Sequence, residues 1–117
     1  MINYQELLEQ AKLNWTVSKE PLQTVRQGIA VPERFALMRE DTQAILGTCG
    51  KGYEVYQNYE LMELLHRISM QTGLTLHSGG CFEGGKLIWI QLKANTLKLP
   101  GGDRVESFFT GLDSFNK

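Results

Sequence analysis

Residues 58–73 read NYELMELLHRISMQTG, and this stretch carries the clearest secondary-structure signal in the chain. Asn58 suits a helix N-cap, and Gly73 is a natural stop. Aliphatic side chains recur at the i, i+3, i+4, i+7 spacing of one buried helix face, at Leu61, Leu64, Leu65 and Ile68. The pattern predicts a helix over residues 58–72 with this stripe against the core.

After the helix the hydrophobic pattern changes to a period of two, which is typical of strands. We expect one strand over Leu74–Phe82 and its partner over Lys86–Ala94, joined by the turn Glu83–Gly85. Thr96–Leu99 and Arg104–Thr110 are expected to form a further hairpin. These segments predict an antiparallel meander that packs one apolar face on the long helix.

Upstream of the helix, Arg34–Arg39 and Ala44–Gly47 flank a polar turn and predict a β-hairpin. Cys49–Gly52 is expected to be a flexible connector. Ser18–Pro32 contains two prolines and a glycine, so we expect mostly a loop, with one short strand near Val25. Such a long connection either pairs with something or is functional.

A short helix is expected at the N-terminus. Asn3 and Glu6 have the spacing of a capping box, and Leu7, Leu8 and Ala11 share one helix face. The predicted fold class is therefore α+β: an antiparallel meander of three to five strands on one long helix, with an N-terminal helix and an additional hairpin.

The chain has 117 residues, of which 42% are hydrophobic and 21% charged, and its formal net charge is −1. We expect residues 1–117 to form a single domain of ordinary globular composition. The near-neutral charge argues against a strongly basic nucleic-acid binder, so nucleic-acid binding would have to rest on a local patch. The longest uncharged apolar run is too short to cross a bilayer, and the N-terminus does not have the pattern of a signal peptide.

The glycine cluster Gly47–Gly52 is the first candidate for a chemical site. A phosphate-binding loop requires Ser or Thr after its Gly-Lys pair, whereas Gly52 follows Lys51 here, and no βαβ unit surrounds the cluster. A turn that uses glycine's conformational freedom is the better interpretation.

The cysteines and histidines do not have zinc-type spacing, although His77 and Cys81 are expected to share one face of a strand. Cys81 beside His66 or His77 is a weak candidate nucleophile, and a small buried thiol is the simpler interpretation. Two cysteines favour a cytoplasmic protein with reduced thiols and leave a single disulfide between Cys49 and Cys81 open. We predict no catalytic, metal or cofactor site.

The Lys86–Ala94 strand contains the best candidate binding surface. Ile88, Ile90 and Leu92 point to one side, and Leu87, Trp89, Gln91 and Lys93 to the other. Aromatic rings next to cations are what single-stranded nucleic-acid binding requires. The predicted nucleic-acid-binding residues are Trp89, Lys93, Lys98, Arg104 and Tyr53. In the structural alternative, Trp89 packs under the Ser18–Pro32 loop and the lysines only keep edge strands soluble.

One resemblance rests on the run Arg39-Glu40-Asp41-Thr42, Leu46-Gly47, Tyr53 and Gln57-Asn58-Tyr59-Glu60. Further matching positions are Trp15-Thr16-Val17, Gly79-Gly80, Gly84, Trp89 and Gly102-Asp103. Together they resemble the N-terminal part of an uncharacterised bacterial family of phage/plasmid-like proteins, a domain of unknown function. The resemblance spans roughly residues 15–110. It implies a mobile-element context in a bacterial cytoplasm, with no known reaction.

The C-terminal end departs from this family. Its members are typically more than twice as long, and a His-Asp-Gly type motif usually follows the strand that corresponds to Arg104–Thr110. This chain continues with residues 111–117, GLDSFNK, instead. We therefore expect either the N-terminal fragment of a family-type protein or a short relative.

Two functions are favoured after these exclusions, and an enzyme of unknown class, with Cys81 as its best candidate residue, is the third hypothesis. The first is a non-catalytic phage- or plasmid-associated module that binds single-stranded nucleic acid in recombination or annealing. This role is also in keeping with a loose fold-level likeness to single-strand annealing proteins of the Rad type. The alternative is a protein-interaction or homo-oligomerisation domain of a mobile-element protein, completed by its edge strands or by a partner, with no nucleic-acid binding.

Overall fold

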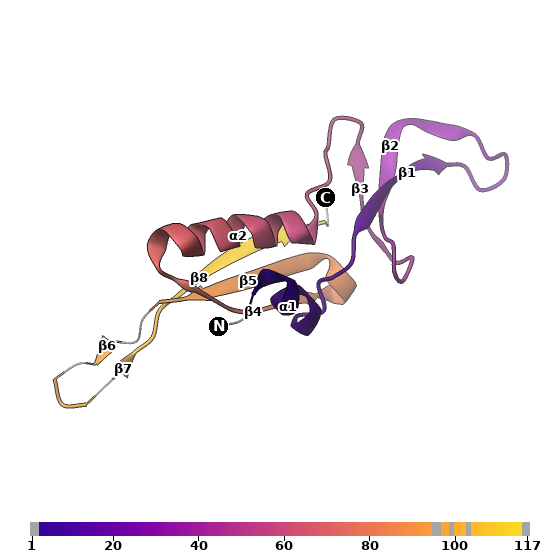
Figure 1. The fold of residues 1–117 in the computed structure, drawn as a ribbon. Helices are drawn as coiled ribbons and strands as arrows, with labels where there is room; N and C mark the ends of the chain where they lie inside the picture. Colours follow the sequence, from indigo (N-terminus) through magenta and orange to yellow (C-terminus); the bar gives the residue numbers. More distant parts are fainter. Residues whose placement is uncertain (1–2, 95–96, 99, 103, 116–117) are drawn as a thin grey trace.

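The computed structural model describes residues 3–94, 97–98, 100–102 and 104–115, with the backbone alone at positions 97, 98, 104 and 105. The molecule is elongated, with extents of 70 × 24 × 24 Å (Figure 1). Its radius of gyration is 18.3 Å, whereas a compact chain of this length would have about 13 Å. A body of two helices and one sheet lies in the middle, a second three-stranded sheet projects from one end, and a two-stranded ribbon projects from the other.

The predicted N-terminal helix is present as α1 (Tyr4–Gln10). The Asn3 side chain accepts a hydrogen bond from the Glu6 N–H at 2.8 Å, and the Glu6 carboxylate accepts one from the Asn3 amide. This reciprocal cap satisfies a backbone donor that the first helical turn leaves free. Leu7 and Leu8 are buried, as the pattern predicts.

The prediction of a loop over Ser18–Pro32 is wrong. This segment contributes most of β1 (Val17–Gln23) and the start of β2 (Ala30–Arg39), which pair antiparallel and form a projecting arm. The strand expected near Val25 is instead the turn of the arm, where Val25 is fully exposed. β1 lies at a sheet edge with a bulge after Pro21, a position that tolerates proline. Without regular alternation of apolar residues, its sequence gives no strand signal.

The β-hairpin predicted for Arg34–Arg39 and Ala44–Gly47 is confirmed, with longer strands. β2 pairs with β3 (Ile45–Gly50), so the order of this sheet is β1-β2-β3. β3 includes Cys49, which is buried, and Gly50, so the predicted flexible connector over Cys49–Gly52 is wrong in its first half. Backbone pairing of Cys49 with Phe35 keeps this end of the strand ordered.

The long helix has the predicted bounds and is α2 (Asn58–Thr72). Its N-cap is Gln57 rather than Asn58, and Gly73 ends it at a φ of 78°, a left-handed conformation that glycine adopts without strain. The predicted stripe is correct at Leu61 and Leu65, which are buried. Leu64, in contrast, is 38% exposed. Met62, outside the predicted stripe, is fully buried instead, because α1 and the sheet both pack against α2.

The predicted hairpin after α2 is confirmed as β4 (Thr75–Phe82) and β5 (Leu87–Lys93), joined by the 3₁₀ turn η1 (Glu83–Gly85). The next predicted hairpin is only partly correct. β6 (Leu97–Lys98) pairs with β7 (Arg104–Val105) in a small ribbon. The last strand of the chain does not belong to this ribbon.

That last strand, β8 (Phe108–Ser114), pairs with β5 instead, which gives a three-stranded sheet in the order β4-β5-β8. The α+β class is thus confirmed. The single meander of three to five strands is corrected to two three-stranded antiparallel sheets and a two-stranded ribbon among the described residues.

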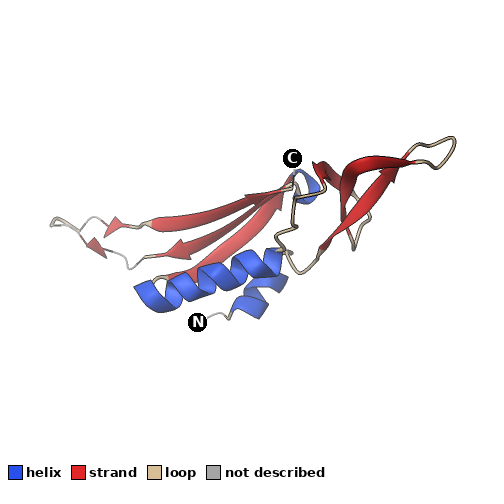
Figure 2. Ribbon diagram, turned by 90° about the horizontal axis from the view of Figure 1, so that it is seen from above, coloured by secondary structure: helices blue, strands red, loops and turns tan. Residues whose placement is uncertain are grey.

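Both helices cover the same face of the β4-β5-β8 sheet (Figure 2). A β-carbon on Gly79 of β4 would lie 3.2 Å from the Ala11 Cβ at the end of α1. One on Gly111 of β8 would lie 3.0 Å from the Leu65 Cδ1 of α2. Glycine therefore lets each helix approach the sheet closely. The opposite face, here called the outer face, has no helix over it in the described part of the chain.

A cluster of side chains fastens the arm to the body. The Arg39 guanidinium binds both carboxylate oxygens of Asp41, at 2.6 and 2.9 Å, and donates to the Gly84 carbonyl at 2.9 Å. It also lies 4.2 Å from the centre of the buried Trp15 ring. We call Trp15, Arg39, Asp41, Gly84 and Gly85 the junction cluster. It accounts for several of the positions on which the family resemblance rests.

The junction cluster predicts a small loss of stability in acid. The hydrogen bond from Arg39 holds the pKa of the Asp41 carboxyl below its ordinary value. Because folding lowers this pKa, the ion pair stabilises the folded chain fully above the unfolded pKa of about 3.9 and loses its effect as the pH falls through the folded-state pKa. Asp41 is largely exposed, so the effect should stay below about 1 kcal/mol.

This is tested by urea unfolding of wild type and Asp41→Asn between neutral pH and pH 2. The difference in unfolding free energy between them should be present at neutral pH and shrink towards zero in acid. An equal difference at both ends of the range would contradict the role given to the ionised carboxylate.

Candidate nucleic-acid interface

The predicted alternation along β5 is confirmed. Ile88, Ile90 and Leu92 are fully buried under the helices, and the residues between them face outward. Strand register then gives the composition of the outer face, which has four rows across β4, β5 and β8. The rows are Phe82–Leu87–Ser114, Gly80–Trp89–Leu112, Ser78–Gln91–Thr110 and Thr75–Lys93–Phe108, and His77, at the register shift of β4, contacts Phe108 of the last row.

Trp89 lies at the centre of this face and is half-buried. A β-carbon on Gly80, its partner on β4, would lie 2.9 Å from the Trp89 Cζ2 and 3.0 Å from its Nε1. The indole therefore lies directly against the β4 backbone, where any larger residue would displace it. On its other side, Leu112 of β8 is 63% exposed. This contact with Gly80 holds the Trp89 ring in one place on the open sheet.

A row of polar side chains crosses the sheet next to Trp89. The Ser78 hydroxyl donates to the Gln91 amide oxygen at 3.2 Å, and the Gln91 amide nitrogen donates to the Thr110 hydroxyl at 3.4 Å. The three side chains come from three different strands, so this polar ladder depends on the register of the whole sheet. It offers hydrogen-bond donors and acceptors beside an aromatic ring.

Beyond the ladder, a second pair of rings lies near Lys93. The ring centroids of His77 and Phe108 are 5.2 Å apart, with an interplanar angle of 45°. Lys93 itself is paired with Glu106, with 3.5 Å between the ammonium nitrogen and a carboxylate oxygen. Both partners are solvent-accessible, so the pair contributes little to stability. The predicted cation Lys93 is thus on the outer face with Trp89, and it forms an ion pair with Glu106.

The other predicted binding residues are placed differently. Lys98 and Arg104 face each other in register on β6 and β7, but their side chains lie outside the described part of the structure. Tyr53 lies in the connection between β3 and α2 and packs against the hydrophobic core, so it is not among the outer-face rows that contain Trp89. Burial there, followed by the nearby Asp113 carboxylate, raises the pKa of the Tyr53 hydroxyl.

The outer face also contains four residues outside the predicted binding set: His77, Phe82, Phe108 and Leu112. Alternation along residues 108–114 could have found the last two, had this segment been paired with β5. His77 was expected to share a strand face with Cys81, but the register shift between Leu76 and Ser78 changes its direction. His77 therefore contacts Phe108 while Cys81 packs against the core.

The thiols and carboxylates do not assemble a chemical site in the described residues. Cys49 and Cys81 are both free thiols. No group of three or more His, Cys, Asp or Glu side chains that could hold a metal ion is found there. Among the helices of the described chain, none is long and apolar enough to span a membrane.

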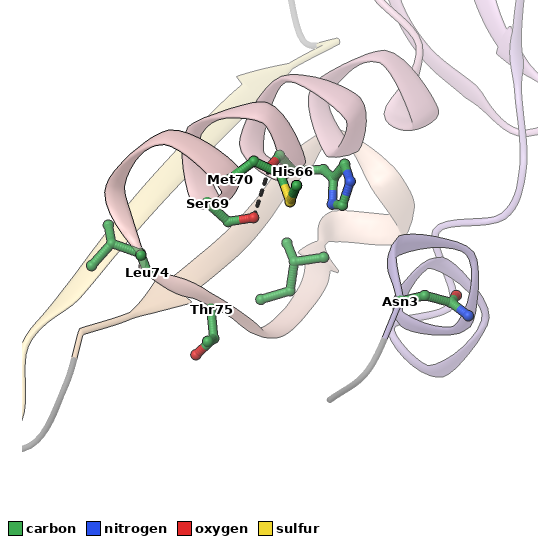
Figure 3. A pocket seen from close by; sticks show the side chains of 8 residues that line it. Asn3, His66, Ser69, Met70, Leu74 and Thr75 are labelled. Carbon is green, nitrogen blue, oxygen red and sulfur yellow. Dashed lines mark hydrogen bonds between the residues drawn. The ribbon is translucent and has the colours of Figure 1, made fainter.

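One cavity of about 330 Å³ lies at the C-terminal end of α2, beside α1 (Figure 3). Its polar groups are already engaged. The Ser69 hydroxyl donates to the His66 carbonyl at 2.6 Å, and the Asn3 side chain caps α1. The His66 ring contacts Tyr4, with 5.1 Å between ring centres. The remaining lining is largely apolar, including Met70, so this cavity offers no charged group to orient a ligand.

Comparison with known proteins gives one match. Neither the curated proteins nor the solved structures contain a match to this chain. A protein-family model described as "Domain of unknown function (DUF932)" matches residues 45–116. The matched range runs from β3 through α2 to β8, so it contains α2 and the whole β4-β5-β8 sheet with its outer-face residues, and it leaves out α1, β1 and β2. The match covers more than half of the 117 residues, and the chain therefore belongs to this family of domains of unknown function.

Proposed function

We propose that this protein is a non-catalytic module that binds single-stranded nucleic acid on the outer face of its β4-β5-β8 sheet. The observation that carries the proposal is the position of Trp89. Its ring lies on an open sheet face, held against Gly80, with no helix over it among the described residues. Every nucleobase has a π-face, so a fixed, accessible indole can stack on a base regardless of sequence.

The surroundings of Trp89 support this proposal. The polar ladder of Ser78, Gln91 and Thr110 supplies hydrogen-bonding groups for the edge of a stacked base. The His77 and Phe108 rings lie near Lys93, four residues further along β5, or about 13 Å at the rise of an antiparallel strand. A strand of nucleotides could therefore place bases on both aromatic positions and hydrogen-bond between them.

The charges support modest rather than strong electrostatic binding. A phosphate can replace Glu106 as the partner of Lys93, because an exposed ion pair is weak. Lys98 and Arg104 add two positive charges to the ribbon that follows β5. With a net charge of −1, few phosphates are neutralised, so the salt dependence of binding should be shallow. In keeping with the resemblance to phage/plasmid-like proteins, we expect a role in recombination or annealing in a bacterial cytoplasm.

A second candidate function is protein binding by the same face. It is favoured by the exposure of Leu112 (63%) and Phe82 (57%), which are apolar side chains without charges beside them in their rows. Leu112→Ser distinguishes the two candidates. If the face binds nucleic acid, removing the Trp89 ring should weaken that binding far more than removing the aliphatic side chain of Leu112.

Trp89→Ala should weaken binding of a fluorescent oligothymidylate at low salt about tenfold, because one stacked base contributes about 1–3 kcal/mol. Anisotropy titrations of wild type and variant measure this. Tyr59→Ala is the matched control, since it removes a 44%-exposed ring from α2, on the helix side of the body, and should change the dissociation constant less than about twofold. No binding by wild type, or equal binding by wild type and Trp89→Ala, would contradict the proposal.

A further inference from the structure

The outer edge of β8 is an open hydrogen-bonding edge. The Phe115 N–H donates to the Lys86 carbonyl and the Ala94 N–H donates to the Ser107 carbonyl. Odd-numbered residues of this segment therefore direct their backbone groups toward β5. Because N–H and C=O directions alternate along a strand, Phe108, Thr110 and Leu112 direct theirs away from the sheet. In the described part of the chain, β8 has a strand neighbour on one side alone (Figure 2).

This edge lacks the features that normally prevent pairing with another chain. Residues 108–112 read FFTGL, with no charge, no proline and no bulge in their register with β5. Phe108 is 45% exposed, Phe109 48% and Leu112 63%, so apolar side chains flank the open edge on both faces of the sheet. An exposed, regular and apolar edge strand favours addition of another strand.

We propose that the occupant of this edge is a second copy of the same chain, with two β8 strands paired antiparallel about a twofold axis at Thr110. In this register Phe108, Thr110 and Leu112 exchange all their outward backbone hydrogen bonds with Leu112, Thr110 and Phe108 of the other copy. Phe109 then lies opposite Gly111, over which the Leu65 side chain of α2 packs. The edge is self-complementary in hydrogen bonding.

The exposed area of the chain supports this pairing. Its accessible surface is 7723 Å², whereas a compact monomer of 13.3 kDa would expose about 6,500 Å². The excess is about 1,200 Å², whereas each partner in a standard stable interface buries roughly 800 Å². An isologous twofold contact is also the commonest way in which soluble chains associate.

The dimer would contain one continuous six-stranded sheet with both outer faces on the same side. Two copies of Trp89 and of the polar ladder would then lie on one platform. This inference goes beyond the proposed function and does not depend on it, because its test is the oligomeric state in the absence of nucleic acid.

Sedimentation equilibrium of the full chain should give a mass approaching twice 13.3 kDa as concentration rises. Thr110→Pro should reduce the mass to that of one chain. The Thr110 N–H points away from β5, so proline there removes an intermolecular donor and leaves the ladder with β5 intact. Circular dichroism and a cooperative thermal transition establish that the variant is folded. A wild-type mass of one chain at all concentrations would overturn the proposal.

Cysteine cross-linking tests the register without relying on a proline variant. In a background with Cys49→Ala and Cys81→Ala, Thr110→Cys should form a disulfide-linked dimer on air oxidation, because directly opposed residues at the axis have Cα atoms about 5.5 Å apart. Ser78→Cys is the matched control on β4, the other edge strand of the same sheet, and should remain monomeric. Cross-linking at position 78 but not at 110 would overturn the proposal.

Discussion

Replacing Gly85 by alanine should lower the free energy of unfolding by about 3 kcal/mol, for two reasons that add. Gly85 has a φ of 115°, a conformation that L-residues rarely adopt and that costs about 1–3 kcal/mol. Its new β-carbon would also lie 2.8 Å from the Cη2 of Trp15, whose ring is only 6% exposed and is stacked under Arg39. Overpacking of this kind costs about 1–3 kcal/mol.

Gly84→Ala is the matched control for this prediction. Gly84 also has a positive φ, of 70°, but a β-carbon there would meet no heavy atom within 4 Å. The expected loss is therefore only the backbone term, about 1–2 kcal/mol. Thermal unfolding should show Gly85→Ala melting about 12 °C below wild type, at roughly 4 °C per kcal/mol for a chain of this size. Equal losses for the two variants would contradict the contact with Trp15.

Gln57→Ala should lower the unfolding free energy by about 3 kcal/mol, because one side chain completes the hydrogen bonding of a buried residue. The Gln57 amide oxygen accepts from the Val17 N–H, and its amide nitrogen donates to the Val17 carbonyl, both at 2.8 Å. Val17 is 3% exposed, so alanine would leave both backbone groups buried and unsatisfied. Each such group costs about 1–3 kcal/mol.

Gln71→Ala, at an exposed position in the last turn of α2, is the control and should change stability by less than about 0.5 kcal/mol. Urea unfolding measures both variants. Because Gln57 joins β1 to the start of α2, hydrogen exchange at Val17 should also rise sharply in the variant. A loss below about 1 kcal/mol with unchanged exchange at Val17 would mean that water replaces both hydrogen bonds.

The body could be predicted from the sequence because its elements have strong local patterns. The stripe of α2, the Gly73 stop and the alternation along Leu87–Lys93 depend on burial against one core, which local periodicity reports directly. The arm could not be predicted this way. Its residues in β1 gain their stability from backbone pairing with β2, and pairing between distant segments leaves no periodic signal.

The residues of the candidate site likewise fall into those that local alternation predicts and those that only strand pairing places there. Trp89 and Lys93 follow from alternation along one strand. Phe108, Thr110 and Leu112 join them only through the register of β8 with β5. The β6-β7 ribbon separates these two strands in the sequence, so their pairing could not be predicted from it. The position of Tyr53 was missed for a different reason. An aromatic residue in a loop gives no indication of whether it faces solvent or, as here, the core.

The central claim, that the outer face binds single-stranded nucleic acid, is tested most directly by NMR titration of the isotope-labelled chain with an unlabelled oligothymidylate. Binding on the outer face should progressively shift the indole N–H resonance of Trp89 and the amide resonances of Gln91 and Leu112. The indole N–H of Trp15, which donates to the Lys12 carbonyl in the core, and the exposed amides of α2 should stay in place. Shifts confined to the arm or to α2, or no shifts at low salt, would contradict it.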